Sequence, residues 1–483
     1  MKRVLLAILS ALLTIIALFH LLPWLAAVAL VPLLYVLRDT SLRDTLKFSV
    51  VFAVSFGLCF FSWIPASAGL FNGAWWSGVL VYVIFTLALS IYFLLLFGSY
   101  NYLGKDGSPV RRALLLGAIV VLIDYLKDTI LATMPWFDFH FGNALAGNTF
   151  TIQLAEWGGV YVLSFVAVFV NVLIVEAIAG KLKLKWVIMP IILFLIVNVG
   201  LYSYRSNQHD GQEIKINLLT ENIDPRVKWE QDGNRIVGEL LRLSEMAGQR
   251  LAAINVWTET VVPWTYIAND DFIQAVLQRS KQVGALTLLG INTPFNENEV
   301  FDSAYLLSPN GAVMGRYDKN FPLAAIESSF AGGLFANTRG VGVARGGAAE
   351  AIVSPIGKLG VYICNEASLP QVAGSQAASG ADFLINISND GWFANSFIPR
   401  QHFYYNRLRA VETRRYVVAN SNMGFKGAIA ANGDMDIHGP SKGVTLTQVS
   451  VFKQGASTLY QLFPWAMLLI SIFIITYFNF KKQ

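Results

Sequence analysis

Three reactive side chains each stand at the end of a short β-type run: Glu259 after residues 254–258, Lys319 after residues 314–318, and Cys364 at the end of residues 359–364. A thiol becomes a nucleophile when a nearby base takes its proton, and a carboxylate can serve as that base. A lysine ammonium can stabilise the oxyanion that forms when a thiolate attacks a carbonyl group. The three residues together predict acyl transfer through a cysteine intermediate.

Each of these residues also has a simpler interpretation. Cys364 alone could be a small buried apolar residue, and Glu259 alone could be a surface charge at a strand end. Lys319 could pair with its neighbour Asp318 in a turn. The three strand-end positions favour a shared site, because reactive groups of α/β folds gather at the carboxyl ends of strands.

The elements that would position these residues alternate between strand and helix. Strands are expected at residues 214–219, 254–258, 286–290, 303–307, 359–364, 383–388 and 416–421, and helices at residues 233–249, 272–282 and 400–415. This alternation predicts an α/β domain over residues 205–455. The sequence contains neither GxGxxG nor GxxxxGK(S/T), so no nucleotide cofactor is expected.

The remainder of the chain is apolar. Hydrophobic residues make up 55% of the 483 residues and charged residues 14%, whereas globular proteins have about 25% charged residues. A helix needs about 20 apolar residues to cross a bilayer. Eight membrane crossings are predicted: two within residues 4–37, and one each in residues 47–64, 75–98, 112–131, 158–179, 186–204 and 463–480.

The basic residues predict how these crossings are oriented. Arg and Lys collect on the cytoplasmic side of a membrane. If residues 4–37 form a hairpin, the inner loops hold the basic residues Arg38, Arg43, Lys47, Lys105, Arg111, Arg112, Lys181, Lys183 and Lys185, followed by Lys481 and Lys482 in the tail. The outer loops 65–74 and 132–157 then hold none, whereas a single span over 4–37 would reverse this order. The α/β domain is therefore predicted on the outer side, which is the periplasm in a bacterium.

Two polar or aromatic features interrupt the apolar half. Asp124 and Lys127 are three residues apart and share a helix face. They could form a structural ion pair or a polar lining to a lipid cavity. Residues 135–141 are rich in aromatic side chains and predict a belt at the membrane interface.

The composition excludes several other classes of protein. Two cysteines, Cys59 and Cys364, cannot build a disulfide scaffold or a cysteine-rich metal site, and the five histidines show no ligand spacing. The net charge of +5 comes without a basic run interleaved with aromatics, so no nucleic-acid partner is expected.

Several blocks of sequence resemble a known family. Residues 256–263 (VWTETVVP), 316–319 (RYDK) and 364–366 (CNE) resemble the three blocks of the carbon–nitrogen hydrolase (nitrilase) superfamily. Over nearly its whole length the chain resembles, more narrowly, the apolipoprotein N-acyltransferase family. The further blocks are 153–161 (QLAEWGGVY), 388–393 (SNDGWF), Gln401, His402, Arg409, Glu412, Arg415, Asn422 and Gly424.

The resemblance implies a fold and a set of site residues. The fold would be an αββα nitrilase-type domain at residues 205–455, on a base of seven transmembrane helices in 1–204 and an eighth in 456–483. Glu259 would be the general base, Cys364 the nucleophile and Lys319 the oxyanion-stabilising group. Supporting roles would fall to Glu327, to Glu366 and to the backbone N–H of Asn365, and Trp229 would lie near the acyl site.

The resemblance also implies the reaction. An acyl chain would pass from a membrane phospholipid through a thioester on Cys364 to the amine of a diacylglyceryl apolipoprotein, in a bacterial inner membrane. No metal or soluble cofactor would be needed, and a monomer is the default expectation. The aromatic residues Trp264, Trp392 and Phe393 would line the acyl entry or else be ordinary core residues. Residues 328–339 would form an amphipathic lid or else a mobile surface loop.

The chain departs from the family pattern at several positions. Residues 321–327 read FPLAAIE where LVPFGE usually follows the lysine, which could alter chain-length preference. Glu221 replaces a common Gly, Asp302 a common Asn, Asn365 an aromatic residue and Ala419 a frequent Arg.

Two other functions are compatible with the same residues. One is a membrane-tethered amidase or nitrilase with water as acceptor, and the other is a non-enzymatic lipid-binding or scaffold protein. The first leaves most of the apolar spans unexplained, and the intact Glu259, Lys319 and Cys364 argue against the second.

Overall fold

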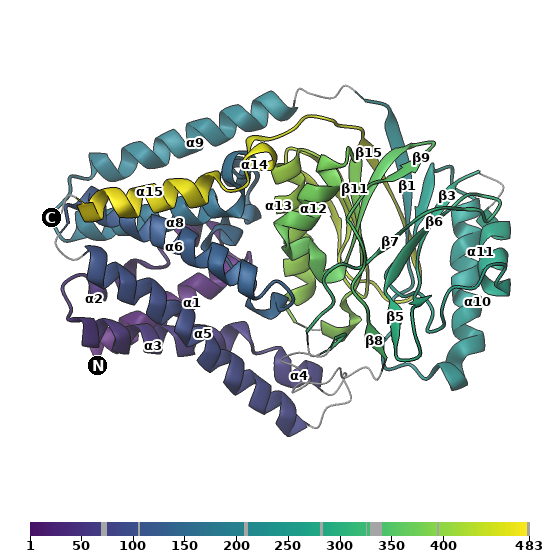
Figure 1. The fold of residues 1–483 in the computed structure, drawn as a ribbon, viewed down its shortest axis with the longest axis horizontal. Coiled ribbons are helices and arrows are strands. Elements are labelled where there is room, and N and C mark those ends of the chain that lie inside the picture. Colours follow the sequence, from purple (N-terminus) through teal and green to yellow (C-terminus); the bar gives the residue numbers. More distant parts are fainter. Residues whose placement is uncertain are drawn as a thin grey trace. The chain divides into compact units, whose positions relative to one another are not determined.

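The computed structural model describes residues 1–68, 75–104, 107–206, 211–280, 284–324, 326–328, 341–393 and 396–480. These residues divide into two compact units. We call residues 1–206 and 458–480 the helical unit, and residues 211–457 the sandwich unit. Each unit is described by itself (Figure 1).

The helical unit consists of α-helices joined by short 3₁₀ segments. Its elements are α1 (Lys2–Leu18), η1 (Pro23–Ala27), α2 (Val31–Leu37), α3 (Leu42–Phe60), α4 (Ile64–Ala68), α5 (Trp75–Gly104), α6 (Pro109–Ile130), η3 (Pro135–Phe137), η4 (Phe141–Gly147), α7 (Thr149–Ile152), α8 (Ala155–Ile178), α9 (Lys185–Ser206), α14 (Leu459–Leu462) and α15 (Ala466–Phe480). Helices at all the predicted crossings from 47–64 onward are present, although their bounds differ by several residues.

Among the described residues, four helical stretches are long and apolar enough to cross a membrane. They are Leu42–Ser67, Trp76–Gly104, Ala155–Ile178 and Lys185–Ser206. The other predicted crossings fall short for physical reasons. α1 has only 17 residues, Pro23–Leu37 and Ala466–Asn479 are shorter apolar helices, and α6 carries Arg111, Arg112, Asp124, Lys127 and Asp128 among its 22 residues.

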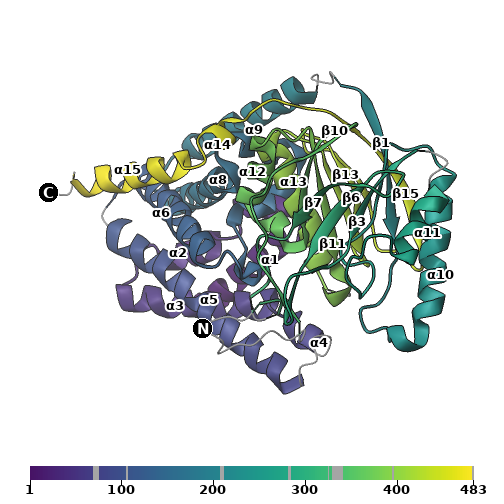
Figure 2. The same ribbon diagram turned by 45° about the vertical axis from the view of Figure 1, so that its right-hand side comes forward.

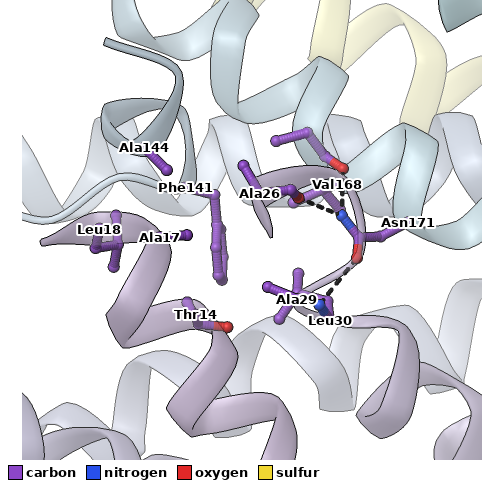
Figure 3. A pocket seen from close by; sticks show the side chains of 11 residues that line it. Thr14, Ala17, Leu18, Ala26, Ala29, Leu30, Phe141, Ala144, Val168 and Asn171 are labelled. Carbon is purple, nitrogen blue, oxygen red and sulfur yellow. Dashed lines mark hydrogen bonds between the residues drawn. The ribbon is translucent and has the colours of Figure 1, made fainter. Parts of the chain in front are cut away.

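The chain turns between α1 and α2, as a hairpin requires, and Asn171 of α8 holds the second half of this turn. Its Nδ2 atom donates to the carbonyl oxygen of Ala26 at 2.7 Å, and its Oδ1 atom accepts from the N–H of Leu30 at 2.9 Å (Figure 3). An apolar environment requires such internal partners for a broken helix. The cavity beside these residues, lined by Phe141, Val168 and Asn171 among others, measures about 10 Å³. A space of that size holds one water molecule at most.

The aromatic run at residues 135–141 does not form the interfacial belt that its composition predicted. Phe139 is 0% exposed and Phe141 5%. The ring of Phe139 packs against those of Phe56 in α3 and Phe93 in α5, at centroid distances of 5.3 and 5.8 Å. The run is a core element of the helical unit, because its neighbours in space are themselves aromatic.

The sandwich unit is built from two six-stranded sheets and a small third sheet. Its strands are β1 (Glu213–Thr220), β2 (Ile254–Val256), β3 (Leu286–Gly290), β4 (Thr293–Pro294), β5 (Glu299–Phe301), β6 (Ser303–Leu307), β7 (Val313–Asp318), β8 (Gly342–Val343), β9 (Ile352–Ser354), β10 (Gly357–Ile363), β11 (Phe383–Asn389), β12 (Val417–Asn422), β13 (Lys426–Ile429), β14 (Met435–His438) and β15 (Thr445–Phe452). The strand orders are β15-β1-β2-β3-β6-β7, β14-β13-β12-β11-β10-β9 and β4-β5-β8.

Helices cover the outer faces of the two large sheets. α10 (Trp229–Gly248) and α11 (Asp271–Ser280) lie side by side on the first sheet, and α12 (Pro370–Ala378) and α13 (Ile398–Thr413) lie on the second (Figures 1 and 2). One apolar core fills the space between the sheets and another fills the space beneath α10 and α11. The sandwich unit therefore has the predicted αββα order, in two mixed sheets.

The direction of the strands brings the reactive positions to one edge of the first sheet. β2 runs parallel to β3, while β6 is antiparallel to β3 and β7 is antiparallel to β6. The carboxyl ends of β2 and β7 consequently point the same way, although β3 and β6 lie between these two strands in the sheet. Residues that follow these two strands can therefore meet.

Candidate active site

Lys319 lies at the centre of the candidate active site, directly after β7. Its Nζ atom is 3.0 Å from Oε1 of Glu327 and 3.3 Å from Oε1 of Glu259. Oδ2 of Asp302 lies 3.5 Å from the same nitrogen, and 0% of the lysine side chain is exposed. A buried ammonium is stable only with negative partners, and these carboxylates supply them.

The antiparallel pairing of β6 with β7 places Asp302 opposite Lys319. Ser303 is paired with Asp318, so the residue before the first and the residue after the second face each other. The backbone N–H of Lys319 donates to the carbonyl oxygen of Asp302 at 2.9 Å. The register of these two strands therefore fixes one carboxyl group beside the ammonium.

Glu259 follows β2, and its segment passes close to the end of β3. The N–H of Val261 donates to the carbonyl oxygen of Gly290 at 2.9 Å. A Cβ atom at Gly290 would lie 2.8 Å from Cα of Glu259 and would collide with the carbonyl oxygen of Thr258. Only glycine at position 290 leaves room for the Glu259 segment.

Cys364 begins the 3₁₀ helix η6 (Cys364–Ser368) directly after β10. Its φ of +55° is in the left-handed region, which non-glycine residues seldom adopt outside sites that need it. Asn386 on the neighbouring strand β11 donates from Nδ2 to the carbonyl oxygen of Cys364 at 3.4 Å. The sharp turn ends the strand and leaves the thiol at its carboxyl end, with 5% of the residue exposed.

The electrostatics of the site keep the resting thiol protonated. Burial raises the pKa of Cys364 well above its ordinary value, and the negative charges of Glu259 and Glu327 raise it further, against the opposing effect of Lys319. The proton must leave before the sulfur can attack. The charge of Glu259 acts on the thiol, and a carboxylate beside a thiol can take its proton.

The same environment keeps Lys319 charged. Burial by itself lowers the pKa of an ammonium, but the charges of Glu327 and Glu259 outweigh burial and raise the pKa of Lys319 well above its ordinary value. A permanently charged group close to the thiol can balance an oxyanion. One carboxylate oxygen from each of Glu259, Asp302 and Glu327 lies within 4.8 Å of the other two, as the ligands of a metal ion would. The cation that they surround is the Lys319 ammonium.

Glu366 connects the Cys364 turn to the segment around Lys319. Its buried carboxylate accepts hydrogen bonds from the backbone N–H groups of Ile363 (2.8 Å), Asn320 (2.6 Å) and Phe321 (3.1 Å) and from the hydroxyl group of Tyr317 (2.8 Å). Because these donors belong to both sheets, one carboxylate sets the distance between nucleophile and lysine. This geometry supports the orienting role predicted for Glu366.

The two other predicted support residues also lie in the site. Oε2 of Glu327 accepts a hydrogen bond from the N–H of Leu323 at 2.8 Å, while its Oε1 faces Lys319. The side chain of Asn365 donates to the carbonyl oxygen of Phe321 at 3.1 Å. Glu327 is thereby held as a partner of the ammonium, and Asn365 stiffens the turn that follows the nucleophile.

Some site residues had no role in the sequence-based prediction. Asp302 appeared there only as a departure from a common Asn, and its contact with Lys319 depends on a strand register that the sequence does not reveal. Asp390, in the SNDGWF block, lies 2.7 Å from Nδ1 of His402 and accepts a hydrogen bond from the hydroxyl of Ser421 at 2.7 Å. The charge of Asp390 also acts on the Cys364 thiol. The block itself was the available signal for Asp390.

The predicted substrate-lining aromatics form two groups within the sandwich unit. The rings of Trp229 and Trp264 meet edge to face at 5.9 Å, on the side of α10 and α11. Trp392 and Phe393 lie in η7 (Asp390–Phe393), where the Phe393 ring contacts His402 at 5.9 Å. Trp229, Trp264 and Trp392 are each partly exposed, whereas Phe393 is buried. Apart from Ser328, the predicted lid at residues 328–339 lies outside the described residues.

The helical unit gives Lys127 different partners from the one predicted. Its Nζ atom is 2.5 Å from Oδ1 of Asp128 and 4.0 Å from Oδ1 of Asp138. Asp124, the expected partner, instead accepts a hydrogen bond from the hydroxyl of Tyr92 at 2.8 Å. Helical spacing alone put Asp124 on the right face, but Asp128 is nearer to the ammonium.

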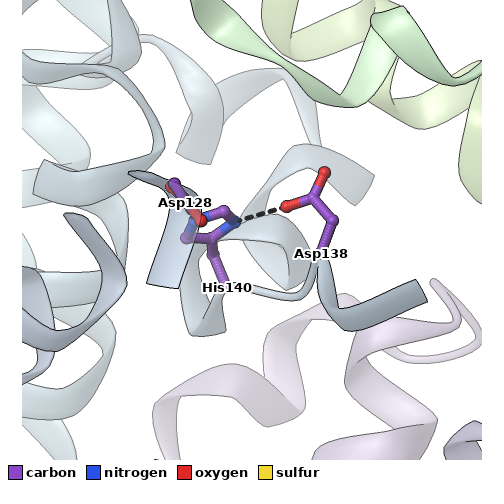
Figure 4. A group of neighbouring side chains, drawn as sticks. All are labelled: Asp128, Asp138 and His140. Atoms are coloured by element: carbon purple, nitrogen blue, oxygen red, sulfur yellow. Dashed lines mark hydrogen bonds and ion pairs between the residues drawn. The ribbon is translucent and has the colours of Figure 1, made fainter. Parts of the chain in front are cut away.

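His140 completes this charged group. Its Nε2 atom is 2.9 Å from Oδ2 of Asp128, and its Nδ1 atom is 3.4 Å from Oδ1 of Asp138 (Figure 4). The three side chains are spaced as metal ligands could be, but the Lys127 ammonium already lies beside both carboxylates. We interpret the group as an internally neutralised network that joins α6 to the segment before η4.

The chain was compared with known proteins. Residues 10–173 match the family model described as apolipoprotein N-acyltransferase N-terminal domain, and residues 222–460 match carbon-nitrogen hydrolase. An apolipoprotein N-acyltransferase of Haemophilus influenzae is 26% identical over 472 residues, which cover 90% of this chain and 86% of the relative. One of Geobacter metallireducens is 26% identical over 357 residues, 69% of this chain and 67% of the relative.

A match to a relative from Allorhizobium ampelinum, also named apolipoprotein N-acyltransferase, spans 64% of that relative at 27% identity. A crystal structure of a carbon-nitrogen hydrolase from Helicobacter pylori G27 is 16% identical and covers 49% of this chain and 89% of that chain. Its TM-score of 0.37 is too low to support a conclusion. The two family models together account for most of the chain. The chain belongs to the apolipoprotein N-acyltransferase family of the carbon–nitrogen hydrolase superfamily.

Proposed function

We propose that the chain transfers a fatty acyl chain from a membrane phospholipid, through a thioester on Cys364, to the N-terminal amine of a diacylglyceryl-cysteine apolipoprotein. The observation that carries the proposal is the buried group of Glu259, Lys319 and Cys364, whose charges act on one another at adjoining strand ends. The names of the relatives support the same reaction.

In the first half-reaction, the carboxylate of Glu259 takes the thiol proton of Cys364. The thiolate attacks the ester carbonyl carbon of the phospholipid, and the electron pair of the C=O bond moves to oxygen. Lys319 and the N–H of Asn365 stabilise this oxyanion. When the oxyanion collapses, the C–O bond to the glycerol breaks, and the leaving lysophospholipid takes the proton from Glu259. The acyl group remains on sulfur as a thioester.

In the second half-reaction, the free amine of the apolipoprotein attacks the thioester carbonyl carbon. Glu259 takes a proton from the attacking nitrogen, and Lys319 again balances the oxyanion. The C–S bond breaks as the amide forms, and the thiolate of Cys364 recovers the proton from Glu259. The enzyme returns to its starting state, as a ping-pong mechanism requires.

A membrane-bound enzyme suits these substrates. Each CH₂ group exposed to water costs about 0.8 kcal/mol, and both donor and acceptor carry long acyl chains. We propose that Trp229, Trp264, Trp392 and Phe393 provide apolar contacts for the acyl chain, since three of them are partly exposed. The apolar helices would keep the thiol close to the bilayer in which both substrates are dissolved.

We further propose eight membrane crossings with residues 205–455 on the outer side of the inner membrane and the chain acting as a monomer. The basic loops support this orientation. Lys183, between α8 and α9, and Lys442, in the sandwich unit, are both exposed. In a chain without Cys59 and Cys364, a membrane-impermeant thiol reagent should label Lys442→Cys in intact cells, and Lys183→Cys only after permeabilisation. The opposite labelling would reverse the orientation.

Mass spectrometry of the full chain tests the reaction. After incubation with a phospholipid that carries an isotopically labelled acyl chain, the protein should gain the mass of that chain. Cys364→Ala should abolish the gain, whereas Cys59→Ala, which removes the other cysteine, should leave it unchanged. An adduct that persists in Cys364→Ala would exclude this nucleophile.

The acceptor distinguishes the proposal from a hydrolase. A lipopeptide with a free N-terminal amine should remove the label from the protein and appear as an N-acyl product. Release of the label as free fatty acid, with the lipopeptide unchanged, would instead indicate that water is the acceptor. A chain that never acquires the label would favour the non-enzymatic lipid-binding alternative.

A further inference from the structure

Asp302 is a buried carboxyl group of the site to which the mechanism above gives no role. Asp302 is 2% exposed and lies directly before β6, opposite Lys319. One of its carboxyl oxygens lies within 4.8 Å of one oxygen of Glu259 and one of Glu327. Oδ2 is 3.5 Å from the Lys319 ammonium. A role for Asp302 beside Glu259 rests on the proposed function of the site.

The count of charges requires a proton among these carboxyl groups. If Glu259, Asp302 and Glu327 were all ionised, three negative charges would share one ammonium in a buried space. An unbalanced buried charge costs several kcal/mol, and carboxyl groups avoid this cost by taking up a proton. The neighbouring thiol of Cys364 is neutral at rest and contributes no positive charge.

The hydrogen-bond donors around the site indicate which carboxyl group holds the proton. Glu327 has the ammonium at 3.0 Å and the N–H of Leu323 at 2.8 Å. Glu259 has the ammonium at 3.3 Å. Among the described residues, neither carboxyl oxygen of Asp302 has a hydrogen-bonding partner. An added proton would turn Asp302 into a donor towards its neighbour and remove this deficit.

Electrostatics favour the same position. Burial raises the pKa of Asp302 well above its ordinary value, and the charges of Glu259 and Glu327 raise it further, while Lys319 opposes them. Among the described residues, the charged groups that act on Asp302 are these three, from the ends of β2 and β7 and from the segment after β7. Their combined effect disfavours the ionised form.

We propose that Asp302 carries a proton at neutral pH and donates it in a hydrogen bond to Glu259, so that the general base works as the ionised half of a carboxylic acid–carboxylate pair. Asp302 is then a positioning residue. A neutral carboxylic acid has the shape of an amide, with one donor and one acceptor turned outward. An asparagine, which the family pattern favours at this position, would serve in the same way without titrating.

The Asp302–Glu259 pair should make the enzyme lose activity at high pH. An enzyme with asparagine at position 302 should not show this loss. When Asp302 ionises, its charge faces that of Glu259, and the hydrogen bond that holds the base is lost. Asp302→Asn should therefore retain the rate of thioester formation at neutral pH to within about threefold. At alkaline pH the rate of the unaltered chain should fall below that of Asp302→Asn. Asp302→Ala, which removes the donor altogether, should lose about tenfold to a hundredfold at every pH.

Infrared spectroscopy measures the proton directly and does not depend on activity. In the full chain with Cys364→Ala, the C=O stretch of a protonated carboxylic acid should be present at neutral pH. Adding Asp302→Asn should reduce this band, while the matched control Asp232→Asn, at a residue of α10 whose side chain is 43% exposed, should leave it unchanged. Other buried acids contribute equally to both spectra and cancel in the difference.

The two measurements separate this proposal from the proposed function. Identical carboxylic-acid bands with and without Asp302→Asn would show that Asp302 is ionised and would overturn the proposal, even if acyl transfer proceeds. Superimposable pH profiles for the unaltered chain and Asp302→Asn would overturn its link to Glu259. A missing acyl adduct on Cys364 would refute the acyltransferase mechanism and leave the infrared result standing.

Discussion

The hydroxyl group of Tyr317 donates a hydrogen bond to Oε2 of Glu366 at 2.8 Å. Tyr317 belongs to β7 in one sheet, and Glu366 belongs to the turn after β10 in the other. Lys319 and Cys364, the proposed oxyanion-stabilising group and nucleophile, follow strands of separate sheets, so their separation depends on contacts of this kind. The site is therefore a property of how the sheets are joined.

Glu366→Gln tests this connection. The amide retains the shape of the side chain but replaces one acceptor oxygen with a donor, which then faces N–H groups that need an acceptor. We expect a loss of at least about tenfold in kcat, because small displacements of reacting groups are costly. Tyr317→Phe removes one neutral donor and should cost about 1 kcal/mol of stability, with a smaller loss of kcat. Kinetics and thermal unfolding of both variants measure these effects; equal kcat in Glu366→Gln and the unaltered chain would contradict the orienting role.

Gly290→Ala tests the fit between β3 and the Glu259 segment. The added methyl would lie 2.8 Å from Cα of Glu259 and even closer to the backbone of Thr258. Because the backbone must move, we expect a loss of about 1–3 kcal/mol of stability and about a hundredfold loss of kcat. A Cβ at Gly347 would meet nothing within 4 Å, so Gly347→Ala is the matched control. Unchanged kcat in Gly290→Ala would show that the base does not depend on this contact.

Much of the sandwich unit was predictable, because its buried strands are short apolar runs. β3 and β6 have the predicted bounds, and β1, β10, β11 and β12 agree to within two residues. α12, with the sequence PQVAGSQAA, was not predicted, since its small residues give no helical pattern of apolar side chains. β14 and β15 were also missed, because partly exposed strands lack a continuous apolar run, and β13 is buried but has only four residues.

The candidate site likewise has a part that the sequence predicts and a part that it does not. Glu259, Lys319, Cys364 and Glu366 could be proposed from the sequence because each stands in a recognisable block, and Glu327 because of its spacing after Lys319; their roles stay predictions. Asp302 could not be given a role, since its place depends on pairing between β6 and β7. In the helical unit, residues 135–141 looked like a membrane interface, but the rings of α3 and α5 bury them. Contacts between distant segments are the part that composition and spacing do not contain.

The buried carboxyl group of Glu221 should make the free energy of unfolding of the chain depend on pH. Burial raises its pKa from 4.5 to about 7, although the hydrogen bond from Thr258 and the charge of Lys426 oppose this shift. Between these two values the folded chain binds a proton that the unfolded chain has lost, so stability falls as pH rises from about 4.5 to about 7. The full loss is on the order of 3 kcal/mol. At acidic pH, where both forms are protonated, the loss is absent.

Glu221→Gln should flatten this part of the stability curve. Its thermal midpoint should equal or exceed that of the unaltered chain above about pH 7, and the advantage should shrink towards about pH 5. Glu213→Gln is a matched control, because Glu213 is an exposed residue at the other end of the same strand, β1. If the two thermal midpoint curves of Glu221→Gln and the unaltered chain run parallel over the whole range, Glu221 does not titrate there.

We expect the buried charge of Lys319 to be strongly coupled to those of Glu327 and Glu259. Replacing Lys319 with Met removes the ammonium that lies 3.0 Å from Glu327 and 3.3 Å from Glu259. Breaking a buried charge pair on one side costs about 3–5 kcal/mol, because the other charge is left uncompensated. Lys319→Met should therefore be destabilised by that amount and should form no thioester. Adding Glu327→Gln to Lys319→Met removes one uncompensated charge and should restore part of the stability, but not the activity.

A double-mutant cycle measures this coupling. Glu327→Gln alone should destabilise the chain, because it removes a negative charge that stabilises the buried Lys319 ammonium. In the Lys319→Met background the same change should stabilise the chain. The interaction energy from the four chains should be about 0.5–3 kcal/mol. If Glu327→Gln has the same effect with and without the lysine, the two side chains act independently. The raised pKa of Lys319 would then need another cause, since Glu327 is the carboxylate nearest to its ammonium.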